Sequence, residues 1–407
     1  MMQLDLEFTR AQFPAFAEPS LRGQAFFENA GGSYTCRHVY DRLTRFYRER
    51  KVQPYSAYPA STLGGDEMDE ARAGLAAMMG VDTDELSFGP STTQNTYVLS
   101  QAFAQMLSPG DVVIVTNQDH EANSGPWRRL GERGMVIREW QMNEAGHLDP
   151  GDLTEMLDDK VKLVCFPHCS NVIGEINDVA AIAKTVHAAG AVCCVDGVSY
   201  APHGIANVGD LGADIYLFSA YKTYGPHQGI MAIRRELGMR LPNQGHYFNA
   251  DCLYKRFTPA GPDHAQVAAS AGMVDYANTL FDHHFTGALD QAGRATAVHD
   301  LMRAQEIATM QPLLDFLRAK NSVRLLGPKA AANRAPTLAL DLGCAAQPFE
   351  AKLAEYGIMA GGGDFYANRA LVAQGIDPDL GVLRVSFVHY TSPAEVQQLI
   401  DALDHVL

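Results

Sequence analysis

Polar side chains follow several apolar segments of this chain, and Lys222 is the most informative of them. Lys222 closes the apolar run DIYLFSAYK (214–222), where it lies between Tyr221 and Tyr224 and just before a Gly-Pro pair. Such surroundings desolvate the amine, which lowers its pKa and lets it attack a carbonyl carbon to form a Schiff base. A solvated surface charge explains this context poorly.

The other candidates share a position, because each comes directly after an apolar run or directly before a helix-like one. In an open parallel sheet, ligands bind at the carboxyl ends of the strands, so we expect these side chains to converge on one edge. They are Ser91, Thr92 and Thr93 ahead of a helix-like segment, His120 and Asn171 after apolar runs, Asp196 and Ser199 after a third, and Ser219 and Tyr221 beside Lys222.

Taken singly, several of these residues have an ordinary structural explanation. Ser91, Thr92 and Thr93 can simply cap a helix, and Asp196 can be a turn or cap residue. His120 alone is more often a satisfied histidine than a catalyst. At a functional site, hydroxyls at a helix N-terminus bind phosphate, and a buried carboxylate faces a cationic nitrogen.

Together, this set of residue types has one economical chemical meaning, which is the binding of pyridoxal 5′-phosphate. The ring of this cofactor acts as an electron sink when its nitrogen is protonated. In this interpretation Lys222 holds the aldehyde as an imine and Asp196 keeps the pyridine nitrogen protonated, while His120 lies against the ring face, Asn171 reaches the phenolic oxygen, and Thr92, Thr93 and Ser219 bind the phosphate.

Seven segments, in their order and spacing, resemble the class V aminotransferases, the group that contains cysteine desulfurases, isopenicillin N epimerase-like proteins and kynureninase. The resemblance covers nearly the whole chain and is strongest to a cysteine desulfurase-like subgroup. It implies the pyridoxal-phosphate-dependent transferase fold type I and a homodimer with active sites at the subunit interface. The segments are FENAGG (27–32), STTQNTYVL (91–99), DHEAN (119–123), SNVIGEIND (170–178), VDGVSYAPH (195–203), FSAYKTYGPHQG (218–229) and RVSFVHYTSPAEV (384–396).

The resemblance also implies which residues bind substrate. Arg384 would bind the substrate α-carboxylate, a role that suits the bidentate geometry of an arginine in a strand of the second domain. Without the resemblance, a surface ion pair is the ordinary explanation for Arg384. Asn29, in the FENAGG segment, and Tyr366, in the stretch MAGGGDFYANRA (359–370), complete the expected set.

The chain departs from the family at positions that bear on the reaction. Cysteine desulfurases carry a nucleophilic cysteine in the loop ahead of the arginine strand, whereas residues 359–370 contain none and Tyr366 stands about where it would be. Ser199 replaces the usual glutamine, and Tyr221 replaces the usual histidine, although its hydroxyl can still donate to phosphate. A persulfide mechanism is therefore disfavoured, whereas direct C–S bond cleavage needs no such cysteine.

The resemblance favours transamination of an amino acid, with Lys222 as the base at Cα. β-Elimination of the C–S lyase or cysteine desulfurase-like type and amino-acid epimerisation stay open as alternatives, because all three begin by labilising Cα. A non-catalytic scaffold would be expected to lose Lys222, Asp196 or Arg384, and all three are present. A nicotinamide-dependent oxidoreductase needs a glycine fingerprint after its first strand, where this chain has NQDHEAN (117–123).

Hydrophobic patterns predict the elements that position these residues. Near-continuous apolar runs that alternate with helices indicate an α/β fold whose mostly parallel sheet is covered on both faces. The expected strands are 112–116, 135–140, 161–167, 191–196, 214–220 and 229–234, and the expected helices are 70–80, 92–107 and 178–189.

The chain changes character after residue 235. A loop-rich stretch (236–264) precedes expected helices at 265–280 and 286–319, and then short strands at 322–326, 336–342 and 382–387 with helices at 347–356 and 393–406. We expect three parts, which are an N-terminal segment (1–25) that packs with the small domain, a large cofactor-binding domain (26–285), and a small C-terminal α+β domain (286–407).

Composition excludes several classes of protein. The 407 residues carry 47 acidic and 32 basic side chains, a formal net charge of −15, which argues against nucleic-acid and anionic-membrane binding. The N-terminus has no signal-peptide pattern, and no stretch approaches the ~18 apolar residues of a membrane span. The seven cysteines show neither a disulfide framework nor metal-site spacing, so we expect a cytoplasmic protein without a bound metal.

Overall fold

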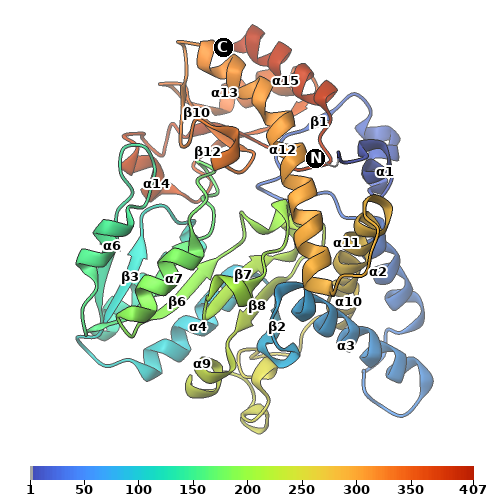
Figure 1. Cartoon of the computed structure of the whole chain (residues 1–407), viewed down its shortest axis with the longest axis vertical. Helices are drawn as coiled ribbons and strands as arrows, with labels where there is room; N and C mark the ends of the chain where they lie inside the picture. The colour runs from blue at the N-terminus through green and yellow to red at the C-terminus, as the bar shows by residue number, and fades with distance from the viewer. Residues whose placement is uncertain (1–2) are drawn as a thin grey trace.

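A seven-stranded sheet forms the centre of the larger part of the molecule in the computed structural model, which describes residues 3–407 (Figure 1). The strand order is β2-β8-β7-β6-β5-β3-β4. Strands β3 to β7 are mutually parallel, whereas β8 runs antiparallel to its neighbours β7 and β2, so the expected α/β class is confirmed. The strands are β2 (Leu86–Gly89), β3 (Val112–Thr116), β4 (Val136–Trp140), β5 (Val161–Pro167), β6 (Val192–Asp196), β7 (Ile215–Ser219) and β8 (Gly229–Ile233).

Both faces of this sheet are covered, which explains why its strands are continuous apolar runs. In β3, Ile114 packs into the core that contains α3 (Pro59–Met79) and α7 (Val179–Ala188), whereas Val115 packs into a second core with α4 (Thr92–Met106). Both side chains are fully buried. The six expected strands agree with the structure to within one residue at each end, and β2 was not expected, because its run LSFG is short and contains a serine.

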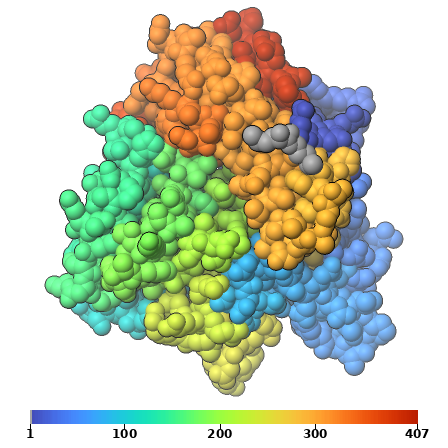
Figure 2. Space-filling model, in the orientation of Figure 1, coloured from blue at the N-terminus to red at the C-terminus, as the bar shows by residue number. Residues whose placement is uncertain are grey.

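The smaller part is built on an antiparallel sheet with the order β12-β13-β10-β9. Helices α13 (Gln347–Glu355) and α15 (Pro393–Val406) contribute Leu353 and Leu399 to its core. Figure 2 shows this part, in orange and red, in direct contact with the green surface of the larger part. Its strands are β9 (Arg324–Leu325), β10 (Thr337–Asp341), β12 (Gly361–Gly363) and β13 (Val382–Ser386), and the short β1 (Ala25–Phe26) pairs in parallel with β11 (Ile358–Met359) beside it.

One long helix, α12 (Gln291–Ala319), belongs to both parts (Figure 1). Val298 and Met302 of its first half lie in the core of the larger part, and Leu313 and Leu317 of its second half lie in the core of the smaller one. The division of the chain at 25/26 and 285/286 stays a prediction, and a boundary at 285 would assign a shared helix to the small domain.

Several helices differ from expectation, among them those packed beside the larger sheet. The helix expected at 265–280 is interrupted at Ser270, which separates α10 (His264–Ala269) from α11 (Ala271–His284). Helix α3 begins at Pro59 rather than near residue 70. Its first turns contain glycines with low helix propensity, and packing against the rest of the protein keeps them helical. Helix α2 (Arg37–Glu49), rich in arginine and tyrosine, was not expected. Within residues 3–407, no helix combines the length and apolarity that a membrane crossing requires.

Candidate functional site

Lys222 lies at the carboxyl end of the central sheet, in a 3-10 turn that follows β7. Only 8% of its surface is exposed. Burial, and after it the positive charge of Arg384, lower the pKa of Lys222 to about 8, while Asp196 and Glu28 oppose the shift. A substantial fraction of the amine is therefore neutral near physiological pH, as a nucleophilic lysine requires.

Asp196 is the last residue of β6, the strand next to β7. Its Oδ1 accepts a hydrogen bond from the Val198 backbone N–H at 2.8 Å, which fixes the carboxyl group. Burial raises the pKa of Asp196 to about 6, against the opposing effects of that hydrogen bond and of Lys222. A carboxylate held in this way attracts a cationic ligand nitrogen strongly, because little water screens it.

Helix α4 directs its N-terminus at the same place. Ser91 is its N-cap, and the Ser91 hydroxyl accepts a hydrogen bond from the backbone N–H of Gln94. Thr92, the first helical residue, shares a 2.8 Å hydrogen bond with Ser219 at the end of β7. Free N–H groups and hydroxyls at such a helix start form a site for an anion.

A cavity lies between these elements. Cys169 also lines this cavity, but burial raises the pKa of its thiol to about 12, so the thiol stays protonated. Ser91 is outside the cavity, where its role is capping. The predicted cofactor residues that the cavity brings together are Thr92, Thr93, His120, Asn171, Asp196, Ser199, Ser219, Tyr221 and Lys222.

His120 lies at the mouth of the cavity, directly before a short 3-10 turn. Its Nδ1 accepts a hydrogen bond from the Ala122 backbone N–H at 3.0 Å. Burial, and after it the positive charges of Lys222 and Arg384, lower the pKa of His120 to about 3. The imidazole is therefore neutral, which suits stacking against a ligand ring better than proton transfer at neutral pH.

Ser199 and Tyr221 complete the wall of the cavity. Both are half-buried. The ring of Tyr221 stacks on that of His227, with 4.7 Å between the centroids and 8° between the planes. Burial raises the pKa of Tyr221, so its hydroxyl stays a hydrogen-bond donor.

Asn171 connects the cavity to the loop 359–370. Its Nδ2 donates to the carbonyl oxygen of Phe365 at 2.9 Å, while its Oδ1 is buried without a partner among the described residues. An orphaned polar atom of this kind is expected where a ligand supplies the missing contact. With the buried lysine, the buried carboxylate and the helix N-terminus, the donor set fits pyridoxal phosphate.

Arg384 in β13 is buried, and other groups of the protein already engage it. One guanidinium nitrogen is ion-paired with Glu28, and another donates to the carbonyl oxygen of Asn171 at 3.1 Å. The ring of Phe365 lies 3.7 Å from the guanidinium carbon. We expected Arg384 to be free to bind a substrate carboxylate. In the structure, the carboxylate of Glu28 already pairs with it. Sequence reasoning missed Glu28, although it stands directly before Asn29.

Asn29 is buried and makes structural contacts. Its Oδ1 accepts a hydrogen bond from the Tyr390 hydroxyl, and its Nδ2 donates to the Ser386 carbonyl oxygen at 3.4 Å. It also lines a second, smaller cavity that borders Lys222. Asn29 thus joins the residues that follow β1 to the small sheet and the turn after it, beside the lysine.

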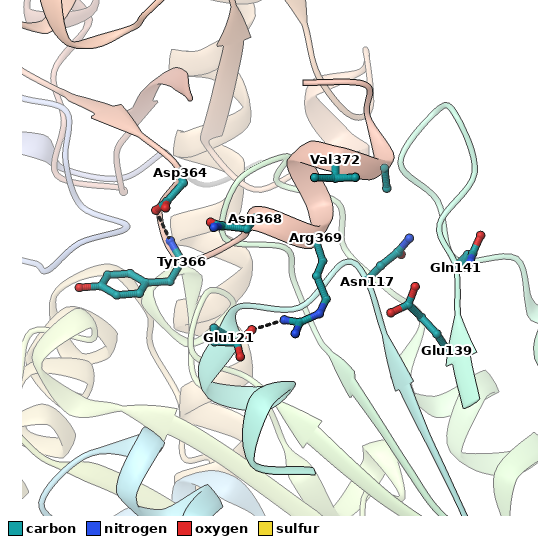
Figure 3. Close-up of a pocket in the computed structure, with 10 residues that line it drawn as sticks. Asn117, Glu121, Glu139, Gln141, Asp364, Tyr366, Asn368, Arg369 and Val372 are labelled. Atoms are coloured by element: carbon teal, nitrogen blue, oxygen red, sulfur yellow. Dashed lines mark hydrogen bonds and ion pairs between the residues drawn. The ribbon is translucent and has the colours of Figure 1, made fainter. Parts of the chain in front are cut away.

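Tyr366 lies outside the Lys222 cavity, with 71% of its surface exposed. It lines two grooves next to the cavity, and the second shares His120 and Tyr221 with the cavity. Figure 3 shows the Tyr366 ring directed away from Asn117. Phe365 and Tyr366 have φ angles of 53° and 56°, a backbone conformation that residues other than glycine rarely adopt.

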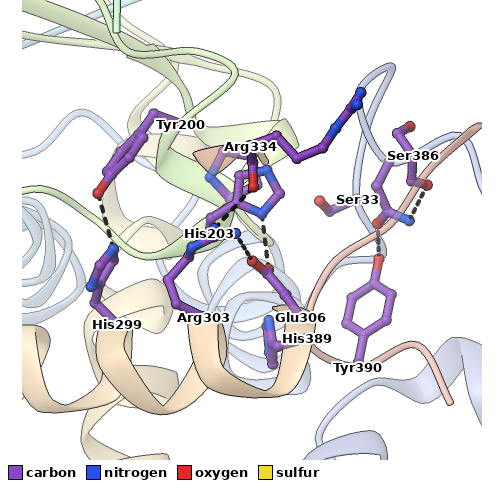
Figure 4. A network of polar contacts seen from close by, with 12 residues as sticks. Ser33, Tyr200, His203, His299, Arg303, Glu306, Arg334, Ser386, His389 and Tyr390 are labelled. Carbon is purple, nitrogen blue, oxygen red and sulfur yellow. Dashed lines mark hydrogen bonds and ion pairs between the residues drawn. The ribbon is translucent and has the colours of Figure 1, made fainter. Parts of the chain in front are cut away.

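A buried polar network lies behind the site and was not expected from the sequence (Figure 4). The carboxylate of Glu306 in α12 is 2.9 Å from Nδ1 of His203 and 2.8 Å from Arg303. Burial opposes ionisation, but the two basic neighbours hold the pKa of Glu306 below its ordinary value. Because His203 and Lys222 border the same small cavity, this network supports the wall of the site.

Comparison with known proteins agrees with this geometry. The aminotransferase class-V family matches residues 25–399. An aminotransferase-like protein from Gibberella zeae, FGM3, is 34% identical over 99% of this chain and 98% of its own. A cysteine desulfurase from Serratia proteamaculans is 28% identical over 100% of this chain and 99% of its own.

The fold has a close counterpart among solved structures. A cysteine desulfurase from Thermococcus onnurineus aligns with a TM-score of 0.85 and 22% identity, over 100% of this chain and 98% of its own. The expected transferase fold type I is confirmed. The chain belongs to the class V aminotransferase family and is a pyridoxal-phosphate-dependent enzyme.

Proposed function

We propose that the enzyme transfers an amino group from an amino acid, with Lys222 as the residue that holds the cofactor. The observation that carries this proposal is the placement of Lys222, Asp196 and the α4 N-terminus around one cavity. Pyridoxal phosphate supplies an electron sink when it is bound. The chain's own residues must then bind it, orient it and move protons.

Each side chain has one task in this proposal. Lys222, as the neutral amine, would hold the cofactor through its aldehyde carbon and would then act as the base toward the proton on the carbon that bears the substrate amino group. Asp196, as a carboxylate, would hold the ring nitrogen. His120 would lie against the ring, Asn171 would bind the phenolic oxygen, and the hydroxyls of Thr92 and Ser219 would bind the phosphate.

The choice of transamination has two supports. The relative that is 34% identical is named an aminotransferase-like protein. A persulfide route needs a reactive thiol. Within residues 3–407, Cys169 is the only cysteine that borders the cavity, and its raised pKa keeps the thiol protonated. The exposed Cys344 does not line the cavity.

β-Elimination of the C–S lyase type is the second candidate, because cysteine desulfurases align with the whole chain and direct elimination needs no nucleophilic cysteine. Epimerisation is the third. By family resemblance we also propose that the protein is cytoplasmic and forms a homodimer with active sites at the subunit interface. Light scattering coupled to size exclusion tests the dimer.

Analysis of the released cofactor distinguishes the reactions. The purified holoenzyme is incubated with pooled primary amines and no keto acid, and the cofactor is released and identified by mass spectrometry. Transamination predicts conversion to the aminated form of the cofactor. Unchanged cofactor together with ammonia, sulfide or an inverted amino acid in the supernatant would replace transamination with elimination or epimerisation.

A further inference from the structure

A second, smaller cavity borders Lys222 and is separate from the one that brings the cofactor residues together. Val198, Ser199 and Lys222 line both cavities, so these three residues form the wall between them. The other walls come from the residues after β1, from a 3-10 turn of the larger part that contains His203, and from β10 and the end of β13 in the smaller part. The side chain of Lys222 therefore has two cavities within its reach.

Polar groups that have no protein partner converge on this second cavity. The hydroxyls of Ser199 and Thr337 and the Nε2 atom of His203 make no hydrogen bond to another described residue, and all three side chains line the cavity. His203 and Thr337 are only 4% and 2% exposed. Buried polar groups that lack a protein partner are satisfied by ordered water, and such a water needs about two to four polar partners. The cavity therefore has the chemistry of a water site.

Glu306 fixes the orientation and the tautomer of His203. Nδ1 of His203 is 2.9 Å from one oxygen of the Glu306 carboxylate, and the other oxygen is 2.8 Å from Arg303 (Figure 4). The two basic neighbours hold the pKa of Glu306 below its ordinary value, so the carboxylate is ionised and accepts the Nδ1 hydrogen. In the neutral imidazole this leaves a lone pair on Nε2. A carboxylate behind the ring also stabilises the imidazolium that forms when Nε2 takes up a proton.

Lys222 needs a proton acceptor inside the protein, because burial separates its amine from bulk water. After it has removed a Cα hydrogen, the lysine carries that proton as an ammonium group. Two titratable groups of the cofactor cavity serve poorly as acceptors. Asp196 is required as a carboxylate beside the ring nitrogen, and burial lowers the pKa of His120 to about 3.

We infer that the second cavity holds a water molecule, and that this water carries a proton from the Lys222 ammonium group to Nε2 of His203. An N–H bond of Lys222 breaks as its proton goes to the water oxygen, and the water gives one of its own protons to Nε2, so the water is regenerated. Glu306 is a positioning residue, because it orients the ring and stabilises the charge that the ring gains. The inference rests on the proposed function, since it concerns the proton that Lys222 takes from the substrate.

A crystal structure of the full-length protein without cofactor tests the water site, because the amine of Lys222 is then free. We expect an ordered water that is hydrogen-bonded to Nε2 of His203 and to Lys222, with the hydroxyl of Ser199 or Thr337 as a further partner. A dry cavity, or a water that does not contact His203, would overturn the inference. This measurement needs no substrate.

The exchange of the Cα hydrogen tests the proton transfer. The holoenzyme is incubated in D₂O with pooled amino acids and a keto acid, and NMR measures the deuterium that enters at Cα for each molecule of product formed. This ratio does not depend on how much of the protein is active. His203→Gln should lower it about tenfold or more, because Lys222 then keeps the proton and returns it. An unchanged ratio in a folded His203→Gln protein would overturn the inference.

His168→Gln is the matched control. His168 is another buried histidine, its Nδ1 is 2.9 Å from the hydroxyl oxygen of Tyr216, and it lines neither cavity. Its loss should leave the ratio of exchange to product unchanged, whatever it does to stability. An equal fall of the ratio in both variants would show that the effect is structural and would overturn the transfer to His203.

Failure of the proposed function and failure of this inference are distinguishable. If no amino acid exchanges its Cα hydrogen in the wild type, the proposed function is wrong, and the crystal structure still decides whether the second cavity binds water at His203. If exchange is normal in the wild type and in His203→Gln, only the proton transfer is wrong.

Discussion

At the scale of single residues, the site is shaped by burial acting on titratable groups. The same desolvation lowers the pKa of Lys222 to about 8 and raises that of Asp196 to about 6. Between these values the carboxylate is charged while part of the lysine is neutral, which is the combination that capture of an aldehyde with a cationic ring nitrogen requires.

The two pKa values predict how cofactor-free protein takes up pyridoxal phosphate. The rate should rise with pH through about 8, because only the neutral amine of Lys222 is nucleophilic. Affinity should fall as pH drops through about 6, since Asp196 becomes protonated there and no longer attracts the ring nitrogen. Stopped-flow absorbance measures the rate, and equilibrium titration measures the affinity.

Asp196→Asn is the matched control for this profile. It should lose the acidic part of the affinity profile and keep a rise in rate, shifted to below pH 8 because the Asp196 charge no longer raises the pKa of Lys222. A rate that does not change between pH 6 and 9 would contradict the pKa assigned to Lys222.

Tyr366→Phe should leave cofactor binding unchanged. The ring is largely exposed and does not border the Lys222 cavity, so loss of its hydroxyl removes no cofactor contact. The visible absorbance and the melting temperature of the holoenzyme provide the measurement. A weakened cofactor affinity would show that the loop 359–370 reaches further into the site than its contacts indicate.

At the scale of elements, close approach of β8 to α4 fixes the N-terminus of α4 beside the Lys222 cavity. A Cβ atom at Gly229 would lie 2.4 Å from the carbonyl carbon of Ser91 and 2.5 Å from the backbone nitrogen of Thr92. Only glycine lets the strand pass so near the helix start. The position of the helix N-terminus therefore depends on one residue of the neighbouring strand.

Gly229→Ala should displace the start of α4 and weaken cofactor binding. Overpacking of this kind costs ~1–3 kcal/mol, which corresponds to a loss of roughly 5- to 150-fold in affinity if it falls on the bound state. Gly261→Ala is the control, since a Cβ atom there meets nothing within 4 Å. Equal cofactor affinities for the two variants, measured by absorbance titration, would contradict this account.

The elements that carry the predicted cofactor residues were predictable from the sequence, and the long-range contacts of Arg384 were not. Strands β3 and β5 to β7 are apolar on both faces, so their ends, and hence Asp196 and Lys222, can be placed from pattern alone. Glu28 and Arg384 are 356 positions apart, and no local pattern reports their pairing. Phe365 and Tyr366 adopt positive φ angles without glycine, which propensity predicts against.

At the scale of the whole molecule, α12 connects the two parts and the network around Glu306 anchors it. Glu306 is fully buried between His203 and Arg303, and His203 borders the cavity near Lys222. The helix also carries residues of both hydrophobic cores. Removal of the Glu306 carboxylate should therefore lower the free energy of unfolding of the whole molecule.

Glu306→Ala should lower the free energy of unfolding by about 3–5 kcal/mol, because it leaves buried basic groups without their partner. Asp315→Ala removes an exposed ion pair with Arg318 on the same helix and should cost less than about 1 kcal/mol. Denaturant titration of both variants gives the comparison. Similar losses for the two would show that the buried network contributes no more than a surface pair.

Reductive trapping shows which lysine holds pyridoxal phosphate, for which we propose Lys222. The holoenzyme is treated with sodium borohydride, digested, and mapped by mass spectrometry. The account predicts a phosphopyridoxyl group on Lys222, and neither this group nor the yellow colour in Lys222→Ala. A group found on another lysine, or Lys222→Ala protein that is still labelled and yellow, would contradict it.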